Sequence, residues 1–413
     1  MATRRRRKSD PDPLRARGAI LAVGIMLWVV LLGLVLSRED RSIRSHLPKL
    51  PIRDARPTIR VRLASLGPPP WTLALKGPAE VLVDGKAVAR VDKKLQLRVD
   101  VDEGGLFLTH DDERLASGSL EINPLSHDAT IDVATPQGSR RYRGTMRISS
   151  TGSAPRPRLE VPLDEYLAQV LPREMPLSYP LEALRAQVIA ARSFALREAL
   201  RRRGHEWAVQ DDERSQVFGG EDDRSRRATE IVASTVNLVL AYEGEVLPGF
   251  FSANCGGRTR SAQEAFGGPT SPPPLQGARC GHCGWSRDFR WTWRGTARSL
   301  LDKLGLAGKL KAGHVIQTKD SEFESNVVFD LSGGKKTVSA VKIRRALGHH
   351  RVKSTCIEGF SLEGSQVTIT GRGFGHGVGL CQNGARGLAD QGLDALAILE
   401  HYYPGAQIVE LQR

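Results

Sequence analysis

The amino-acid sequence predicts a mixed α+β protein, in which one transmembrane helix precedes a strand-rich part and an α+β core. Three observations support this class. An apolar run without charge lies near the N-terminus, short alternating runs follow, and later segments repeat apolar residues at helical spacing. Alternation is typical of half-buried strands, and recurrence after three and four residues is typical of amphipathic helices. The 413 residues allow two or three domains of about 100–200 residues each, which excludes a collagen-like or wholly disordered chain.

The net charge indicates an anionic partner without identifying it. The chain has 60 Lys and Arg residues against 46 Asp and Glu residues, a net charge of +14. Residues 1–17 hold seven basic and two acidic residues, which accounts for +5 and leaves +9 for the rest of the chain. A basic globular part suits nucleic acid, an anionic membrane or an acidic polymer. The alternative is that the remaining +9 is an ordinary solvated surface.

The segment from Gly18 to Leu36 contains no charged residue, and as a helix it is about 28 Å long, which matches one hydrocarbon core. It is longer than the apolar region of a cleavable signal peptide, and no small-residue cleavage site follows it. The 15 residues before it hold seven Lys and Arg, and the 15 after it hold four, which places the N-terminus inside. We therefore expect a single-pass signal anchor in a cytoplasmic or inner membrane, with the C-terminal bulk in the periplasm or at the cell surface.

This topology divides the chain into an ordered series of segments. Residues 1–17 form a basic cytoplasmic tail and residues 18–36 the anchor. Residues 37–57 are charged and interrupted by proline without periodicity, which is typical of a linker. Residues 58–160 alternate in short runs and include an Asp-Gly turn at Asp84, so strands and hairpins are expected.

Residues 161–413 mix helices and strands and form the expected core. A short helix over 163–170 is followed by a stiff loop between Pro172 and Pro176. Apolar residues then recur at helical spacing from Leu181, after a proline that a first helical turn tolerates, until Gly204 ends the run. Further expected elements are a polar loop over 210–220, a helix over 228–235, a hairpin over 238–254, a helix over 296–304 and two final helices separated by Gly392.

Two signatures about 180 residues apart resemble the SpoIID/LytB family, which includes stage II sporulation protein D and the amidase enhancers. They are VPLDEYLAQVLPREMPLSYPLEALRAQVIAARSFAL from Val161 and GRGFGHGVGLCQNGARGLA from Gly371, the latter followed by HYYPG. The shorter motifs YRG, SQVFGG and SANCGGRT at residues 142–144, 215–220 and 252–259 also match. The resemblance extends from about residue 59 to residue 412.

The resemblance implies a lytic transglycosylase that cleaves the MurNAc–GlcNAc bond of peptidoglycan, in glycan that an amidase has stripped of stem peptides. It aligns Glu174 with the catalytic glutamate of the family. The chemistry of the residue agrees, because cleaving a glycosidic bond requires a carboxylic acid that protonates the leaving oxygen. If the 6-hydroxyl of the sugar is the nucleophile, the same carboxylate then acts as the base. The alternative for Glu174 is a surface acid near a helix N-terminus, which is common.

Two further motifs contribute candidates for substrate binding. Arg192 and Ser193 lie in the motif AARSFA, where the arginine either pairs with Glu174, binds a sugar or lactyl carboxylate, or forms a structural salt bridge. In SQVFGG, the amide of Gln216 and the ring of Phe218 suit sugar hydroxyls and ring faces. The alternative for this second motif is a tight turn.

The glycine-rich segment from Gly371 to Gly379 contributes further candidates. Alternating glycines in a strand allow another backbone or a polymer to approach closely. His376 would then donate to a developing oxyanion or a sugar hydroxyl, or else it is a buried structural histidine. Gln382 and the neighbouring Asn383 are candidate glycan donors.

Cys255, Cys280 and Cys283 predict a structural zinc site, because three thiolates and one histidine match the softness and coordination number of zinc. The resemblance also implies zinc at this part of the fold. However, Phe251 stands where a histidine is expected, and His282 is the nearest substitute although its position beside Cys283 is awkward. The fourth ligand is then another histidine or water. An extracytoplasmic CxxC is alternatively a disulfide, and Cys381 is expected to be a small buried residue of the site wall.

These observations predict a membrane-anchored enzyme whose partners are peptidoglycan glycan strands, a cell-wall amidase and the membrane, and for whose chemistry no metal is required. The rival hypothesis is a noncatalytic wall-binding activator of an N-acetylmuramoyl-L-alanine amidase; the acid in LPREMP favours the enzyme. Nucleic acid as a partner would require the reverse topology and is not expected.

Overall fold

The computed structural model describes residues 47–51, 57–135, 138–151, 154–222, 224–317, 323 and 325–412. The chain forms two units, residues 1–49 and residues 50–413, and the fold below is that of the second unit. The predicted cytoplasmic tail and the anchor over 18–36 lie outside the described residues, as does most of the linker. Among the described residues, no helix has the length and apolar character needed to cross a membrane.

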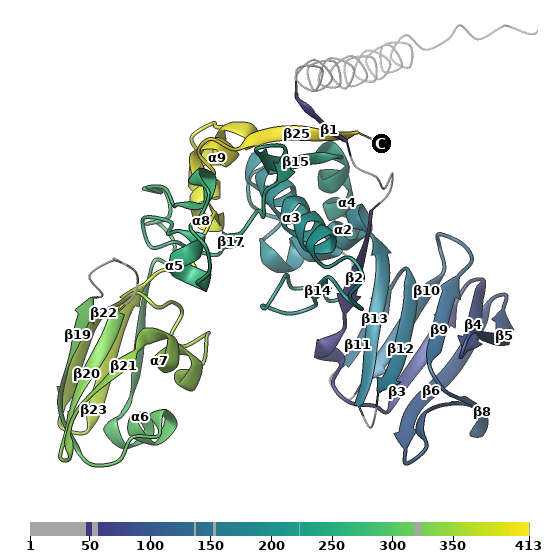
Figure 1. Cartoon of the computed structure of the whole chain (residues 1–413), viewed down its shortest axis with the longest axis horizontal. Helices are drawn as coiled ribbons and strands as arrows, with labels where there is room; N and C mark the ends of the chain where they lie inside the picture. Colours follow the sequence, from purple (N-terminus) through teal and green to yellow (C-terminus); the bar gives the residue numbers. More distant parts are fainter. Residues whose placement is uncertain are drawn as a thin grey trace, which may run out of the picture. The chain divides into compact units, whose positions relative to one another are not determined.

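Residues 58–162 supply all but one strand of two sheets, which confirms the prediction of strands in this part (Figure 1). The strands pair antiparallel, except that a short strand at residues 209–210 joins the first sheet in parallel. Alternate residues of each strand, such as Leu73 and Val99 in one sheet and Val81 and Ile122 in the other, are fully buried in one shared hydrophobic cluster. The first sheet has the strand order β14-β2-β13-β12-β9-β4-β5 and the second the order β11-β10-β3-β6-β7-β8. The strands of the first sheet are β2 (Thr58–Arg62), β4 (Ala79–Val83), β5 (Lys86–Val91), β9 (Leu120–Pro124), β12 (Thr145–Thr151), β13 (Ala154–Pro162) and β14 (Val209–Gln210), and those of the second are β3 (Trp71–Lys76), β6 (Lys94–Asp102), β7 (Gly105–His110), β8 (Glu113–Ser117), β10 (Thr130–Thr135) and β11 (Gly138–Tyr142).

A helical group follows the sheets, built around α3 (Leu181–Arg201). This helix begins at the predicted residue after Pro180 and contacts α2 (Leu163–Glu174), α4 (Ser225–Ser234), α8 (Gln382–Ala389) and α9 (Ala395–Tyr402). Small and aliphatic residues are buried on most sides of α3, because neighbours surround it. The predicted helix over 228–235 and the two final helices on either side of Gly392 are therefore confirmed.

The helix α2 differs from the prediction, because it continues through Pro172 and ends at Glu174. Pro172 has no N–H to donate to the carbonyl four residues earlier, so the helix loses one hydrogen bond there. Met175 N still donates to the Leu171 carbonyl at 3.0 Å. Met175 itself is extended, with φ −140° and ψ 135°. A residue before proline is disfavoured in the helical region, so Pro176 ends the helix immediately after Glu174.

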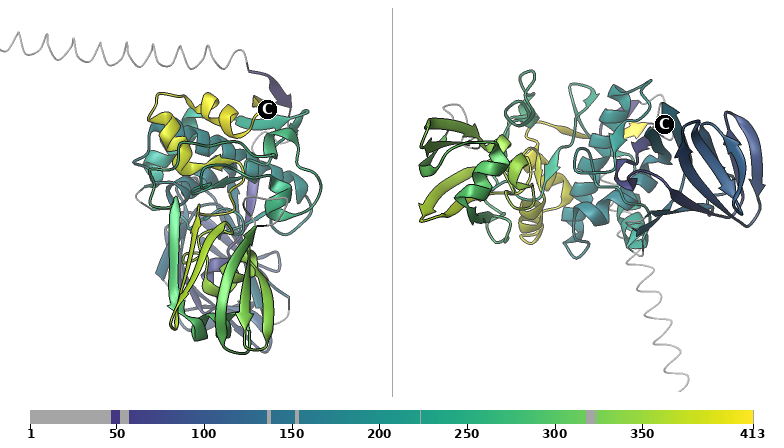
Figure 2. Two further views of the ribbon diagram at one scale, coloured as in Figure 1. Left: turned by 90° about the vertical axis from the view of Figure 1, so that its left-hand side faces the viewer. Right: turned by 90° about the horizontal axis from the view of Figure 1, so that it is seen from below.

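The second half of the chain adds a separate hydrophobic cluster, which includes Trp291, Trp293, Phe329 and Ile369. Two antiparallel sheets and two helices surround it, and Figure 2 shows the strands of each sheet side by side. One sheet has the order β18-β23-β22 and the other the order β19-β20-β21. The elements are β18 (Arg290–Thr296), α6 (Ala297–Leu304), β19 (Leu310–Gln317), β20 (Ser325–Leu331), β21 (Gly334–Ser339), α7 (Ala340–Leu347), β22 (Ile357–Glu363) and β23 (Gln366–Arg372).

Short elements connect the helical group to these sheets. β15 (Leu238–Tyr242) pairs with β16 (Glu245–Val246) and with β25 (Gln407–Gln412), so the predicted hairpin is present but ends at Val246. β17 (Phe251–Ser252) instead pairs in parallel with β24 (Leu380–Cys381). This pairing brings the segment SANCGGRT beside the glycine-rich segment, and a short helix, α5 (Ala262–Phe266), follows.

The structure requires glycine at position 144, between β11 and β12. Gly144 has φ +103°, and a Cβ atom there would overlap the Glu160 carbonyl oxygen of β13. Gly138 also has a positive φ, +133°, but its Cβ position is open. We expect Gly138→Ala to lower the free energy of unfolding by about 1 kcal/mol and Gly144→Ala by about 3 kcal/mol, because only the second adds a collision to the backbone strain. Urea unfolding of both variants tests this, and equal losses would contradict it.

Candidate functional site

Glu174 lies at the C-terminal end of α2 and is partly exposed. Its Oε1 accepts a hydrogen bond from the backbone N–H of Val217, in the loop SQVFGG, at 2.6 Å. The other carboxyl oxygen makes no hydrogen bond within the part of the chain that the structure describes. One oxygen of Glu174 is therefore held by the protein, and the other is available to a ligand.

The surroundings of Glu174 raise its pKa from 4.5 to about 7. Burial is the largest cause, because it penalises the charged form, and the negative charge of Glu213 adds to it. The hydrogen bond from Val217 acts in the opposite direction. The helix end contributes further, since the C-terminus of a helix carries a partial negative charge. At neutral pH, both the acid and the carboxylate are therefore populated.

The side chains of the SQVFGG loop hold the loop in place. Gln216 is fully buried, where its Nε2 donates to the Ala191 carbonyl at 3.2 Å and its Oε1 accepts from the Tyr166 hydroxyl at 2.9 Å. The buried ring of Phe218 stacks on Tyr166 and on Tyr142, with centroids 5.2 Å and 6.0 Å apart. Gln216 uses its amide for these internal bonds, and Phe218 is 1% exposed although it is among the residues that line the cavity described below. Together they fix the Val217 N–H that faces Glu174.

The paired glycines of the loop allow a close approach of protein backbone. Gly220 has φ +79°, and a Cβ atom there would collide with the Arg141 carbonyl of β11. At Gly219, a Cβ would collide with the Arg173 guanidinium. The glycines therefore let the loop lie against β11 and α2.

Arg192 does not pair with Glu174. Its side chain is 1% exposed, and its guanidinium donates to the Thr235 carbonyl at 2.6 Å, to the Leu238 carbonyl at 3.2 Å and to Asp164 at 3.1 Å. These bonds join α3 to α2 and to the end of α4. Arg192 therefore forms a structural salt bridge, the last of the three possibilities given above. Ser193 is also buried, and its hydroxyl donates to the Ile189 carbonyl at 2.6 Å.

His376 and Gln382 lie in the second signature, and neither contacts Glu174. His376 Nδ1 accepts from the Val378 N–H at 3.0 Å, and the ring lies near Phe266 with centroids 5.1 Å apart. Burial, and then the charge of Arg260, lower its pKa to about 4, so the imidazole is neutral at neutral pH. Gln382 is buried and donates to Gln187 on α3 at 3.4 Å.

A cavity of about 800 Å³ is lined by residues next to Glu174, although Glu174 itself is not among its lining residues. Its lining residues include the neighbours of the glutamate, Arg173 and Val217, together with Glu213. The sequence analysis missed most of this lining. Lining residues that lie in or next to the motifs LPREMP, YRG and SQVFGG could have been predicted from the sequence. Ser65 and His349 could not, because they come from distant segments that only the fold brings together. The full lining is Ser65, Ser139, Arg140, Arg173, Asp211, Asp212, Glu213, Arg214, Val217, Phe218, Gly219 and His349.

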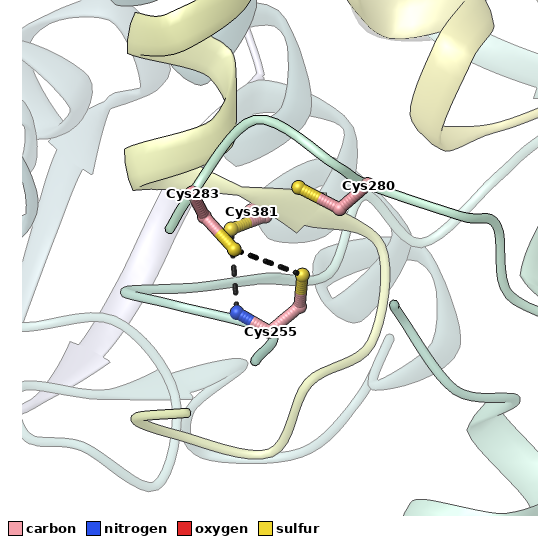
Figure 3. Close-up of side chains that lie close together, drawn as sticks. All are labelled: Cys255, Cys280, Cys283 and Cys381. Carbon is pink, nitrogen blue, oxygen red and sulfur yellow. Dashed lines mark hydrogen bonds between the residues drawn. The ribbon is translucent and has the colours of Figure 1, made fainter. Parts of the chain in front are cut away.

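Four buried cysteines form a second constellation, shown in Figure 3: Cys255, Cys280, Cys283 and Cys381. Their sulfur atoms all lie within 4.8 Å of one another, and those of Cys255 and Cys283 are 3.8 Å apart. The cluster depends on the β17–β24 pairing, because Ser252 lies opposite Cys381 in that register. Cys255 N then donates to Cys381 Sγ at 3.3 Å.

The fourth residue of this cluster is not the predicted one. Cys381 occupies the fourth position, and the expected substitute His282 does not, because the Nδ1 of that ring lies 3.2 Å from Gln391 Nε2 outside the cluster. The position of His282 between two clustered cysteines directs its ring away from the sulfur atoms. Cys356 lies apart and accepts from Arg372 Nε at 3.4 Å. All five cysteines are free, so the structure contains none of the disulfides considered above.

The cysteine cluster fits a tetrahedral metal ion. A zinc–sulfur distance of about 2.3 Å places tetrahedral sulfur atoms about 3.8 Å apart. Hydrogen bonds within the cluster, those with Cys255 foremost, lower the pKa of Cys280 and Cys283 and so favour their thiolate forms. The pKa of Cys255 and of Cys381 is raised, for Cys255 mainly by hydrogen bonds with its neighbours and for Cys381 mainly by burial. The group can therefore hold a metal.

Comparison with known proteins finds a matching family model and several similar proteins. The family model "Stage II sporulation protein" matches residues 156–242, which contain Glu174 and the SQVFGG loop. Stage II sporulation protein D of Bacillus amyloliquefaciens is 30% identical over 269 residues, covering 60% of this chain and 75% of the relative. An uncharacterized protein of Brachyspira hyodysenteriae is 29% identical over 381 residues, covering 86% and 94%. The amidase enhancer of Bacillus subtilis is 24% identical over 296 residues, covering 59% and 40%.

The raised pKa of Glu174 predicts a pH-dependent effect of Glu174→Gln on stability. Folding raises the pKa of this carboxyl, so the free energy of unfolding falls as the pH increases from 4.5 to about 7. The reason is that the unfolded chain releases the proton at a lower pH than the folded one. The amide removes this loss and still accepts from Val217. We expect the variant to exceed the wild type by up to about 3 kcal/mol at pH 8 and to equal it near pH 4. Urea unfolding at both pH values measures this, and an offset independent of pH would contradict it.

Proposed function

The chain belongs to the SpoIID/LytB family, and on this basis we propose that it is a membrane-anchored lytic transglycosylase that cleaves peptidoglycan glycan strands. The relatives named for sporulation and amidase enhancement support a role at the cell wall. The observation that carries the enzymatic proposal is Glu174, a carboxyl with a pKa of about 7 beside a cavity of about 800 Å³. A glycosidase acid needs such a pKa in order to be protonated near neutral pH.

The first step of the proposed reaction uses the acid form of Glu174. Its carboxyl proton passes to the oxygen that links MurNAc to GlcNAc, and the bond between this oxygen and MurNAc C1 breaks. The GlcNAc end leaves as an alcohol, and positive charge develops at C1 and the ring oxygen. The resulting carboxylate keeps its hydrogen bond from Val217, so the glutamate changes charge without changing position.

The second step returns the proton to Glu174. The 6-hydroxyl of the same MurNAc attacks C1, and the carboxylate accepts the proton of this hydroxyl. A 1,6-anhydro ring forms, no water is consumed, and the acid form is restored. One carboxyl therefore serves as acid and base in turn, and no second protein carboxylate is needed as a nucleophile.

The buried residues of the signatures are proposed as positioning residues. Gln216 and Phe218 hold the loop that carries the Val217 N–H, and Arg192 holds α3 against α2, which ends in Glu174. Substrate would contact the cavity lining instead. Residues 18–36 are proposed as the membrane anchor, which would place the cavity outside the cytoplasm.

The rival proposal is a wall-binding protein that activates an amidase without cleaving glycan. The similarity to an amidase enhancer is the observation that favours it. Both proposals share peptidoglycan as the partner, but only the enzyme requires an ionisable group at position 174.

The enzymatic proposal predicts that Glu174→Gln abolishes cleavage. We expect at least a 10²-fold loss of anhydromuramyl products from amidase-treated sacculi, because the amide carries no transferable proton. In the wild type, the rate should fall about tenfold for each pH unit above about 7, as the acid form is depleted. Mass spectrometry of the released glycan measures both effects.

The matched control is Glu165→Gln, which makes the same change on the same helix, at a residue whose carboxylate faces His127 instead of the SQVFGG loop. This variant should retain the wild-type rate. Undiminished anhydro products from Glu174→Gln would contradict the mechanism. Wild-type protein that stimulates an amidase but releases no anhydro ends would favour the rival proposal.

We also propose that Cys255, Cys280, Cys283 and Cys381 bind one structural zinc ion. The ion would link the segment after β17, the CxxC loop and β24, and it would stabilise the arrangement of the second signature. The cluster does not line the cavity beside Glu174, so the proposed chemistry uses no zinc.

The zinc proposal predicts one metal ion per chain by elemental analysis of the purified protein. Cys381→Ser should lose most of this metal, because it removes one of four ligands, and a chelator should lower the melting temperature of the wild type by roughly 5 °C or more. Cys356→Ser is the control, since this cysteine lies outside the cluster. Metal-free wild-type protein, or equal metal content in both variants, would overturn the assignment.

A further inference from the structure

A row of cations lies on the exposed side of the edge strand β18. Arg290, Thr292 and Arg294 are exposed, whereas Trp291 and Trp293 between them are 5% exposed and belong to the hydrophobic cluster. Successive side chains of a strand point to opposite faces, so the two arginines lie on one face, about 13 Å apart along the strand. The buried tryptophans fix the strand that carries them.

The loop after α7 completes a basic groove along this strand. The groove has a volume of about 510 Å³ and four Lys and Arg among its lining residues. Two of these are paired with carboxylates outside the lining, Arg290 with Glu358 at 2.8 Å and Lys353 with Asp288 at 2.6 Å. Within the part of the chain that the structure describes, Arg294 and Arg351 make no ion pair with a carboxylate. Their charges are therefore available to an anion. The lining residues are Arg290, Trp291, Thr292, Trp293, Arg294, His350, Arg351 and Lys353.

Hydroxyl groups lie beside the cations on the same face. In the antiparallel register, Thr292 pairs with Thr370 of β23 and Arg294 pairs with Thr368. Both threonines of β23 are partly exposed. A face that alternates cations with hydroxyl groups suits a polymer that carries carboxylates and sugar hydroxyls better than it suits an apolar partner.

Two adjacent histidines line the groove and the cavity near Glu174, one each. His350 lines the groove, and its Nε2 lies 3.3 Å from Glu213. His349 lines the cavity, and its Nδ1 lies 3.9 Å from the same carboxylate. Glu213 also lines the cavity and contributes to the raised pKa of Glu174. The two lining histidines therefore share one carboxylate, which relates the end of the groove to the proposed catalytic cavity.

We propose that the basic groove along β18 is a second glycan-binding site, which recognises the lactyl carboxylates of glycan stripped of its stem peptides. This inference rests on the proposed function, which supplies the polymer. Stem peptides occupy these carboxylates in intact peptidoglycan, and their removal leaves one free carboxylate on each MurNAc. Repeated anions along the strand would thus match repeated cations along the groove, and this site would hold the strand while another bond enters the cavity.

The test uses the full-length chain with Glu174→Gln, so that bound glycan stays intact. Binding to amidase-treated sacculi is measured by co-sedimentation, with and without the double change Arg294→Gln and Arg351→Gln. We expect the double change to weaken binding roughly fivefold, because two exposed charge contacts are lost. The same sacculi with their lactyl carboxylates converted to amides should bind weakly to both proteins.

The matched control is Lys335→Gln with Lys336→Gln, which removes the same charge from exposed positions on β21. It should bind like the parent, and thermal unfolding should show all variants folded. The inference is overturned if the arginine variant binds like this control, or if amidation leaves binding unchanged. It is also overturned if the arginine variant loses binding only to inorganic polyphosphate, which would assign the groove to a phosphate polymer.

Cleavage by the chain with Glu174 intact separates this inference from the proposed function. Arginine-dependent binding without anhydro products would support the groove and contradict the transglycosylase. Anhydro products with arginine-independent binding would contradict the groove alone. In an active enzyme, Arg294→Gln with Arg351→Gln should raise KM for long denuded glycan and leave kcat unchanged.

Discussion

The hydrogen bond from the Val217 N–H to Glu174 is the contact around which the candidate site is arranged. It holds a carboxyl at the end of a helix, where burial raises the pKa to about 7. Pro176 ends the helix immediately after this residue, and the buried Gln216 fixes the loop that supplies the donor. The reactivity proposed for Glu174 thus depends on residues that never contact a substrate.

Several motif residues that were candidates for ligand contact instead contact other parts of the protein and stabilise the fold. Arg192 binds backbone carbonyls at the end of α4 and beside β15, and Phe218 is stacked between two tyrosines. Substituting these residues would therefore reduce stability and activity together. The groups that face solvent near the glutamate belong to the cavity lining, which includes arginines and carboxylates from several distant segments.

Two short sets of contacts connect segments that lie far apart in the sequence. The pairing of β17 with β24 assembles the four cysteines, and the histidine pair at 349–350 relates the basic groove to the cavity through Glu213. A metal at the cysteines would stiffen the first connection. The second would let a long anionic polymer occupy two sites at once, which raises affinity without a stronger contact at either.

The α+β class, the strands before residue 160 and the long helix from Leu181 could be predicted from the sequence, because periodicity and proline positions act locally. The motif LPREMP made Glu174 the candidate acid. The sequence also indicated the three cysteines near residue 280. The folded structure alone shows that Cys381 completes the cluster in place of His282, that Arg192 and Gln216 are buried, and that Glu213 and His349 line one cavity. These outcomes depend on strand pairing and packing between distant segments, and no local pattern in the sequence records them.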